Sequence, residues 1–309
     1  MTGYILGRLL GLFFSVLAIS LILFLAVRWL PGTPWIEAEI PLTGSARDNM
    51  IRKYGLDEPV WKQYAKYLWN LSHLDLGNSY IYKTDSVWKT MARGWPATAK
   101  IGAITLLVSI PLGIVIGVVA SLKQNSIFDY AMTLTATAGI TVPNFAVAVW
   151  LVLFVAIYLD LTPTQGWGTW QHMILPVIAY SLAPLGLVAR FTRVSMLEAM
   201  RSDYVRTARA KGLNEPTVVV RHIFKNALIP IITLFGPLLP NLMTGSIFIE
   251  QTFAIPGLGK HFVTSIFDRD YPVILGMFML VAVLFGLTYV ISDILYTWAD
   301  PRVRLTRGS

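Results

Sequence analysis

The sequence predicts an all-α integral membrane protein with six transmembrane helices and a helical extracytoplasmic insert that follows the first helix. Three observations support this fold class: 55% of the 309 residues are hydrophobic, only 14% are charged, and the apolar residues gather in long runs. A soluble domain carries about 25% charged residues, so this composition is too apolar for one. The net charge of +8 is a basic excess of the kind that membrane proteins place in cytoplasmic loops and against lipid headgroups.

Two residue types that build reactive sites are scarce. The sequence contains no cysteine, which excludes disulfides, thiolate metal sites and a cysteine nucleophile. No two of its four histidines share a metal-ligand spacing, so we expect no metal site. These histidines are His73, His172, His222 and His261.

Six segments are apolar over the roughly 20 residues that a spanning helix needs. They are 4–30, 97–122, 130–159, 173–189, 227–249 and 272–298. The first has Arg8 ahead of an apolar run, as a secretory signal does. That run, from Leu9 to Val27, exceeds the usual length of about 7–15 residues, and no small-x-small cleavage site follows it. We therefore expect the segment to remain as a membrane helix.

The distribution of Lys and Arg predicts the orientation of these helices. The connection at 190–226 carries eight basic residues against three carboxylates, whereas the connection at 160–172 carries no basic residue. Short loops rich in Lys and Arg stay in the cytoplasm. Six spans place both termini on one side, which the basic connection shares, so we expect cytoplasmic termini. The tail adds Arg302, Arg304 and Arg307 to that side.

The segment between the first two spans is too long and too regular for a simple turn. We divide the chain into a first transmembrane helix (1–30), an extracytoplasmic helical insert (31–95) and a core membrane domain (96–309). Within the insert, Asp57 and Pro59 are typical of a helix start. The insert either packs on the outer ends of the spans or docks a partner, and the sequence leaves both roles open. Its apolar residues recur at helical spacing: Val60, Tyr64, Tyr67, Leu68 and Leu71.

The cytoplasmic connection 190–226 contains two predicted short helices. Ser202 and Asp203 are N-cap types, and Gly212 suits the left-handed residue that ends a helix. Arg206 and Arg209 are three residues apart and share a helix face. A second helix starts at Asn214 and Pro216 and runs toward Lys225. A solvated basic loop explains the charges, but the small residues favour close approach by another surface. These small residues are Thr207, Ala208, Ala210 and Gly212.

The first of these helices resembles a known signature. The run Asp203, Tyr204, Val205, Arg206, Thr207, Ala208, Arg209, Ala210, Lys211, Gly212 and Leu213 is similar to the coupling loop of ABC importer permeases in its peptide/nickel form. The general signature has Glu-Ala-Ala at 206–208 and Ile-x-Leu-Pro at 222–225, and this chain has neither, as is usual for the peptide branch. Further segments resemble the same branch: 54–59, 63–64, 75–79, 250–259, 269–272 and 300–302.

The resemblance covers nearly the whole chain and implies a type I ABC importer-like permease in a prokaryotic inner membrane. It implies a heterodimer with a second permease, two cytoplasmic ATPase subunits and an extracytoplasmic substrate-binding protein. The closest likeness is to the B-type oligopeptide permease, while nickel or glutathione transport by the same family stays open. The chain lacks the Gly-x-x-x-x-Gly-Lys-Ser/Thr phosphate cradle. We therefore expect no catalytic residues and no cofactor in this chain, with ATP and Mg²⁺ bound by the partner subunits.

Four residues are candidates for a gate or a translocation path. Pro143 removes a backbone donor in the middle of the third span, followed by Asn144, and such a break often marks a transport path. A simple proline kink is the alternative. Glu250 and Gln251 end the fifth span, where a carboxylate at the headgroup level is the alternative reading. Gly113 with Gly117 in the second span is a small-x-x-x-small pair expected to pack against another helix.

Two rival functions belong to other classes. A transporter driven by an ion gradient would need an internal repeat and carboxylates in mid-span, and we find neither. A six-span intramembrane serine protease would need a Gly-x-Ser-Gly site and a histidine within a span. Gly245 and Ser246 are followed by Ile247, and His172 only borders a span. Both rivals are weaker than the importer hypothesis.

Overall fold

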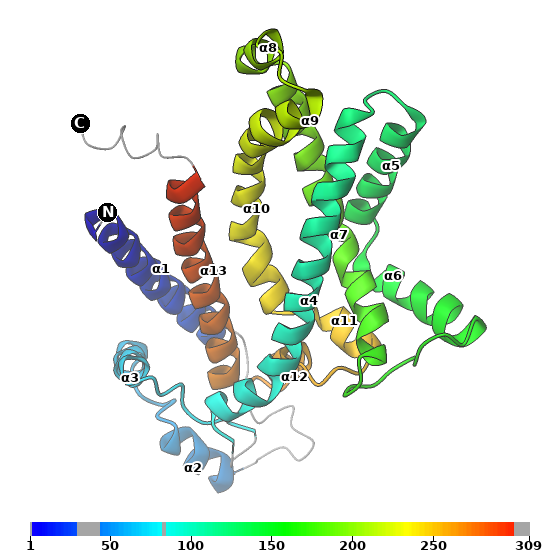
Figure 1. The fold of residues 1–309 in the computed structure, drawn as a ribbon. Helices are drawn as coiled ribbons and strands as arrows, with labels where there is room; N and C mark the ends of the chain where they lie inside the picture. Colours follow the sequence, from blue (N-terminus) through cyan, green and yellow to red (C-terminus); the bar gives the residue numbers. More distant parts are fainter. Residues whose placement is uncertain (1, 30–43, 82–84, 300–309) are drawn as a thin grey trace. The chain divides into compact units, whose positions relative to one another are not determined.

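The computed structural model describes residues 2–29, 44–81 and 85–299 (Figure 1). Over these ranges the regular structure is helical, apart from an isolated β-bridge between Asn78 and Ser86. The helices are α1 (Thr2–Trp29), α2 (Ser45–Lys53), α3 (Val60–Ser72), α4 (Val87–Leu122), α5 (Ile127–Thr141), α6 (Asn144–Leu151), η1 (Val152–Tyr158), α7 (Gln171–Met200), α8 (Asp203–Ala210), α9 (Glu215–Thr217), η2 (Val218–Phe224), α10 (Lys225–Met243), α11 (Ile247–Thr252), α12 (Leu258–Phe267) and α13 (Tyr271–Ala299). Leu30 of the first predicted span, residues 31–43 and 82–84 of the predicted insert, the tail arginines and the 300–302 motif lie outside the described residues.

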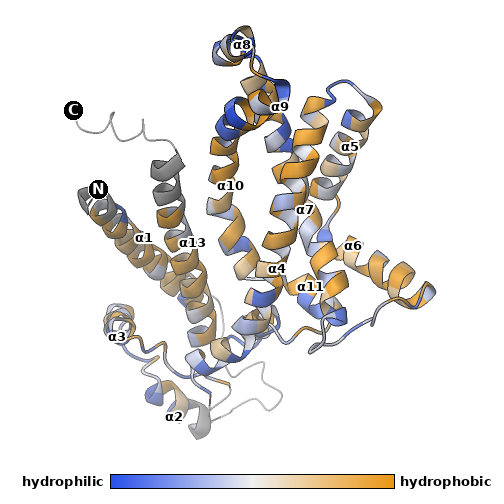
Figure 2. Cartoon of the chain, in the orientation of Figure 1, coloured by the Kyte–Doolittle hydropathy of each residue, from blue (hydrophilic) through white to orange (hydrophobic). Residues whose placement is uncertain are grey.

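The spanning helices agree with the predicted fold class. Among the described residues, five helical runs are long and apolar enough to cross a membrane, and a bent pair brings the number to six if it counts as one span. Figure 2 shows the hydrophobic colour along most of α1, α7 and α13, and the hydrophilic colour at connections, including those near α8 and α9. Because α7 continues to Met200, the first part of the predicted 190–226 loop is helix.

The third predicted span is not one continuous helix. Between α5 and the run Asn144–Tyr158 the axis turns by 103°. Pro143 has no N–H to donate, and its ring forces the preceding residue out of the helical region. Val142 accordingly has an extended ψ of 124°. The break predicted at Pro143 is therefore present, and the turn is far larger than the simple proline kink that was the alternative.

The described residues within 2–98, together with 256–286, form one compact unit. A buried carboxylate ties two of its segments together: Asp270 is 2% exposed, and it accepts hydrogen bonds from the Ser79 hydroxyl and, at 3.0 Å, from the Tyr80 N–H. Burial raises the pKa of Asp270. Around this link lies a core cluster formed by residues of α1, Tyr80 and residues of α13. Its members are Phe24, Val27, Tyr80, Tyr271, Ile274 and Leu275.

Residues 99–255 and 287–299 form the second compact unit of the described chain, and α7 is its central helix. A Cβ at Gly113 would lie 2.8 Å from Val188 Cβ, and one at Gly117 would lie 2.5 Å from the Ala189 carbonyl oxygen. No side chain fits at either position, so α4 approaches α7 closely there. The predicted packing role of this small-residue pair is confirmed.

Candidate functional site

The helix α8 begins and ends where the sequence predicts. Ser202 has an extended backbone at the N-cap, although its hydroxyl donates to the Ala199 carbonyl at 2.5 Å instead of capping the helix. Gly212, just after the helix, has a φ of +77°, the left-handed conformation that ends a helix. Figure 1 places α8 and α9 together at one end of α7 and α10, all within the second unit.

Two residues anchor α8 to the spanning helices. Val205 has no exposed surface and Ala208 is 4% exposed. Both belong to a core cluster with Met196 of α7 and with Val218 and Ile223 of η2. Ala208 is therefore small because it packs inside its own chain, and it is not available to an approaching surface. The helix is held from behind by α7 and by the run that leads into α10.

The outer face of α8 is exposed, and all of its residues but one are polar or charged. It is formed by Asp203, Arg206, Thr207 and Ala210. Arg206 reaches Asp203 on the same helix at 3.4 Å, and its side chain remains 78% exposed. Arg209 instead pairs with Glu215 through two contacts of 2.6 and 3.1 Å. The two arginines are neighbours on the helix, as predicted. Arg209 forms an ion pair with Glu215 within the chain, whereas the exposed Arg206 is accessible to a partner.

The second short helix joins α8 to a spanning helix. The Asn214 side chain accepts from the Thr217 N–H at 3.2 Å and caps α9, as expected for an Asn-x-Pro start. The chain then continues through η2 into α10 with helical backbone at each junction. Helix α8 is therefore connected through α9 and η2 to α10, and packed through Val205 against α7.

A buried ion pair supports this region and was missed by the sequence reasoning. Asp129, at the start of α5, is 1% exposed and accepts from Arg193 of α7 through contacts of 2.5 and 2.7 Å. The Asn125 N–H also donates to Asp129, at 3.0 Å. Arg193 is one of the eight basic residues of 190–226, and the sequence pattern assigns it only to the cytoplasmic side. The signal was available, because an acid at the edge of an apolar span needs a partner.

The two pairs of path candidates come together. Helix α6, which starts at Asn144, packs against α11, and the rings of Phe145 and Phe248 lie 5.4 Å apart. Glu250 in α11 is 4% exposed, so it is buried in the protein and does not lie at an open headgroup level. Its neighbour Gln251 is exposed, as is Pro143. The break in the third span and the buried carboxylate therefore belong to one local structure.

Groups of metal ligands are absent from the part of the chain that the structure describes: no three His, Asp or Glu side chains gather there in a way that could hold an ion.

Residues 109–305 match the family described as binding-protein-dependent transport system inner membrane component. The chain belongs to this family. It is an integral membrane component of a transport system and not an enzyme, as predicted. The sequence resemblance to importer permeases is therefore confirmed.

Relatives extend this similarity over the full chain. The dipeptide transport system permease protein DppB of Bacillus subtilis (strain 168) is 38% identical over 305 residues, which cover 99% of each chain. The oligopeptide transport system permease protein OppB of Escherichia coli (strain K12) is 39% identical over 306 residues, covering 98% of this chain and 100% of the relative. A chain of the inward-facing MetNI methionine ABC transporter has a TM-score of 0.56 at 16% identity and covers 68% of this chain and 96% of its own length. This last likeness confirms the predicted fold.

Proposed function

We propose that the chain is one of two permease subunits of an ATP-driven importer of peptides. The substrate class is supported by the full-length similarity to dipeptide and oligopeptide permeases. The proposed assembly contains a second, similar permease, two cytoplasmic ATPase subunits and an extracytoplasmic binding protein. It lies in the cytoplasmic membrane of a prokaryote, with both termini of this chain in the cytoplasm.

The observation that carries the coupling role is the anchoring of α8. Val205 and Ala208 fix its inner side to the spanning helices, while the polar outer side stays exposed. Such a helix fits into a groove of an ATPase and transmits the closure of the ATPases to the membrane. Because a ligand shifts a conformational equilibrium only by binding its states differently, each ATPase state must hold α8 differently.

Movement of α8 has a defined route to the translocation path. It passes to α7 through Val205, and the ion pair between Asp129 and Arg193 links α7 to α5. Helix α5 leads into the break at Pro143, beside Glu250 in α11. We assign this local structure to the path, together with the partner permease. ATP and Mg²⁺ act in the ATPases, because this sequence has no phosphate cradle.

Charge changes on α8 test the coupling role. Arg206→Glu is expected to lower peptide uptake and peptide-stimulated ATPase activity roughly tenfold in proteoliposomes of the full importer, equivalent to about 1.4 kcal/mol of docking energy. The matched control is the double exchange Arg209→Glu with Glu215→Arg, which reverses the two charges but keeps the ion pair between these positions. If Arg206→Glu retains full uptake with normal membrane insertion, α8 is not the coupler. Gly212→Pro is a second probe, because proline cannot adopt the φ of +77°.

The alternative functions are separated by substrate and energy source. Uptake of labelled tripeptide, glutathione and Ni²⁺ is compared in the same proteoliposomes, with and without ATP inside. Peptide uptake that needs ATP supports the proposal, and preference for Ni²⁺ or glutathione would assign the chain to another branch of the family. Uptake driven by an imposed ion gradient without ATP would replace the importer with a secondary transporter.

A further inference from the structure

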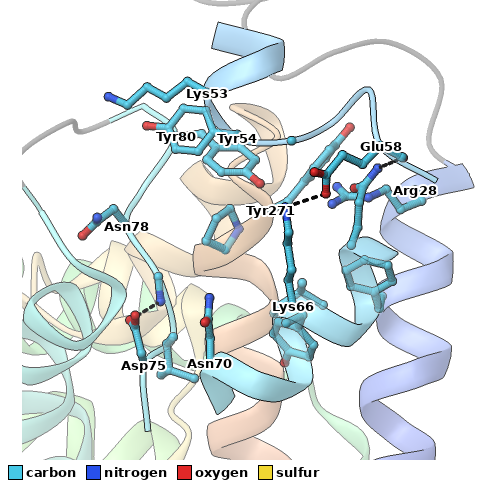
Figure 3. Close-up of a pocket in the computed structure, with 18 of the residues that line it drawn as sticks. Arg28, Lys53, Tyr54, Glu58, Lys66, Asn70, Asp75, Asn78, Tyr80 and Tyr271 are labelled. Atoms are coloured by element: carbon cyan, nitrogen blue, oxygen red, sulfur yellow. Dashed lines mark hydrogen bonds and ion pairs between the residues drawn. The ribbon is translucent and has the colours of Figure 1, made fainter. Parts of the chain in front are cut away.

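A cavity of about 430 Å³ lies in the first unit, at the Trp29 end of α1 (Figure 3). Its walls come from α1, α2, α3, the segment at 75–80 and the start of α13. None of the predicted functional residues lines it, and the proposed importer mechanism does not use it.

The contacts of α3 place the cavity beside the end of a candidate membrane span. The Tyr64 hydroxyl lies 3.0 Å from Ser20 Oγ of α1, and the ring of Phe24 lies 5.3 Å from that of Tyr64. Ser20 and Phe24 precede Trp29 by nine and five residues, which is roughly 14 and 8 Å along a helix. Helix α3 thus packs beside the end of the candidate span Leu6–Trp29, and the ends of a spanning helix are where it meets the lipid headgroups.

The outer side of α3 fits this environment. Trp61 is 73% exposed and Trp69 is 68% exposed, and both lie on the side opposite Gln63 and Tyr67. Tryptophan is enriched at membrane interfaces, where one part of the ring is apolar and the N–H is hydrated. The two indoles are positioned to contact lipid, while the inner side of α3 forms a wall of the cavity.

The cavity carries a surplus of positive charge. Four cationic side chains, Arg28, Arg52, Lys53 and Lys66, line it against two carboxylates, Glu58 and Asp75. Glu58 is already occupied by Lys66 at 2.6 Å and by Lys62 at 3.1 Å. Figure 3 shows Arg28, Glu58 and Lys66 on one side of the cavity, with Lys53 and Tyr54 on another. Arg52 has no side-chain partner among the described residues. An anion is the complementary ligand.

Three polar atoms of the lining lack hydrogen-bond partners within the described residues: Arg28 Nε, Gln63 Oε1 and the Tyr67 hydroxyl. Gln63 is only 7% exposed. Its amide nitrogen donates to the carbonyls of Leu56, at 3.3 Å, and Glu58, at 2.7 Å, which leaves Oε1 as the acceptor. Arg28 Nε needs an acceptor and Gln63 needs a donor, so the ligand must supply both.

We propose that this cavity binds the headgroup of an anionic phospholipid that carries hydroxyl groups, of the phosphatidylglycerol type. The phosphate accepts hydrogen bonds from Arg28 and is attracted by Arg52 and Lys53, and a glycerol hydroxyl donates to Gln63 Oε1. The acyl chains lie outside the cavity, beside Trp61 and Trp69. The site follows from the geometry of the first unit alone, and only its assignment to the outer leaflet rests on the proposed orientation.

Native mass spectrometry of the full-length chain in detergent tests the site. The chain is supplied with palmitoyl-oleoyl phosphatidylglycerol, the matching phosphatidylcholine, or phosphatidylmethanol, which has the same charge as phosphatidylglycerol but no hydroxyl. The test variant is Arg52→Gln with Lys53→Gln, two exposed positions at the end of α2. The control is Lys89→Gln with Arg93→Gln, exposed cations of the same unit that pair with Asp85 and do not line the cavity.

The expected result is one tightly held phosphatidylglycerol on the wild type and the control, and its loss, or a dissociation constant at least tenfold higher, on the test variant. Phosphatidylcholine should bind equally weakly to the wild type and both variants. Phosphatidylmethanol should bind the wild type less tightly than phosphatidylglycerol does. Equal lipid binding by the test variant and the control would overturn the proposal. Displacement of the lipid by millimolar glycerol phosphate or by dialanine would also overturn it, in favour of a soluble phosphate ester or a peptide. Because lipid binding is measured without transport, its result can be interpreted even if the importer hypothesis fails.

Discussion

Helices α3 and α8 are both short and amphipathic, and both are held against spanning helices by one side, yet they present opposite surfaces. Helix α8 buries the aliphatic Val205 and Ala208 and exposes charged and small polar residues. Helix α3 buries Gln63 and packs two tyrosines inward, and it exposes Trp61 and Trp69. A charged outer face suits a protein partner in water, whereas exposed indoles suit the lipid interface. The outer face, and not the amphipathic pattern itself, distinguishes coupling from membrane anchoring.

The largest difference between α3 and α8 should be whether the outer face of each helix is in contact with lipid or with water. The chain has no cysteine, so single nitroxide labels at Trp69→Cys and Thr207→Cys report cleanly in reconstituted vesicles. We expect the label at 69 to be accessible to oxygen and shielded from a water-soluble nickel chelate, and the label at 207 to show the reverse in the absence of ATPases. Equal nickel accessibility at both positions would remove the membrane assignment of α3.

The ion pair between Asp129 and Arg193 joins α5 to α7, the helix that carries α8, and breaking it should be the most destabilising change. Asp129→Asn leaves Arg193, whose side chain is 25% exposed, without its counter-charge, and we expect a loss of about 3 kcal/mol in the free energy of unfolding. An SDS titration of the purified chain measures this loss. The exposed Asp203→Asn is the control and should change the free energy of unfolding by less than about 0.5 kcal/mol. A comparable loss in both variants would show that burial of the pair is not the cause.

Val205→Ala should loosen the anchor of α8. It removes two methyl groups from a fully buried position, with an expected cost of about 2 kcal/mol. Because the loss is local, hydrogen exchange should accelerate in 203–213 before it does in α7. Thr207→Ala, on the outer face of the same helix, should leave the exchange of this segment unchanged. Uniform acceleration across the chain would contradict a local anchor.

On α3 the anchor is polar, so its removal should cost less. Tyr64→Phe deletes the hydrogen bond to Ser20 but keeps the ring against Phe24, and we expect a loss of about 1 kcal/mol in the free energy of unfolding. Tyr204→Phe on α8 is the matched change at an exposed ring, where we expect no loss. The comparison would fail if the two substitutions had the same effect.

The smallest effect should be a pH dependence in the first unit. Burial raises the pKa of Asp270 above that of the unfolded chain, so the folded state holds the proton more tightly. Stability should therefore be greatest below the unfolded pKa and should fall as the pH rises through the folded one. Denaturation of the chain between pH 4 and pH 7 measures this slope. Asp270→Asn should flatten it, and an unchanged slope would assign the titration to another group.

The sequence alone predicted several features of the fold and the candidate site because they depend on local patterns. Apolar runs of sufficient length identified the spanning segments, and Gly212 marked the end of α8 through its need for a left-handed backbone. Pro143 predicted a break for a local steric reason, but not the 103° turn, which depends on how α6 packs against α11.

Other features depend on residues far apart in the chain, and only the tertiary structure decided them. Asp129 meets Arg193 across 64 positions, and Ser79 meets Asp270 across 191. Single-sequence patterns carry no information on such pairs, because a charged residue looks the same whether it faces water or a buried partner. The same limit applied to α8, where Ala208 and Ala210 are identical in the sequence but only Ala208 is buried. The sequence by itself therefore determined the spans, the short helices and the family resemblance, while tertiary packing determined which face of each helix is free to meet a partner.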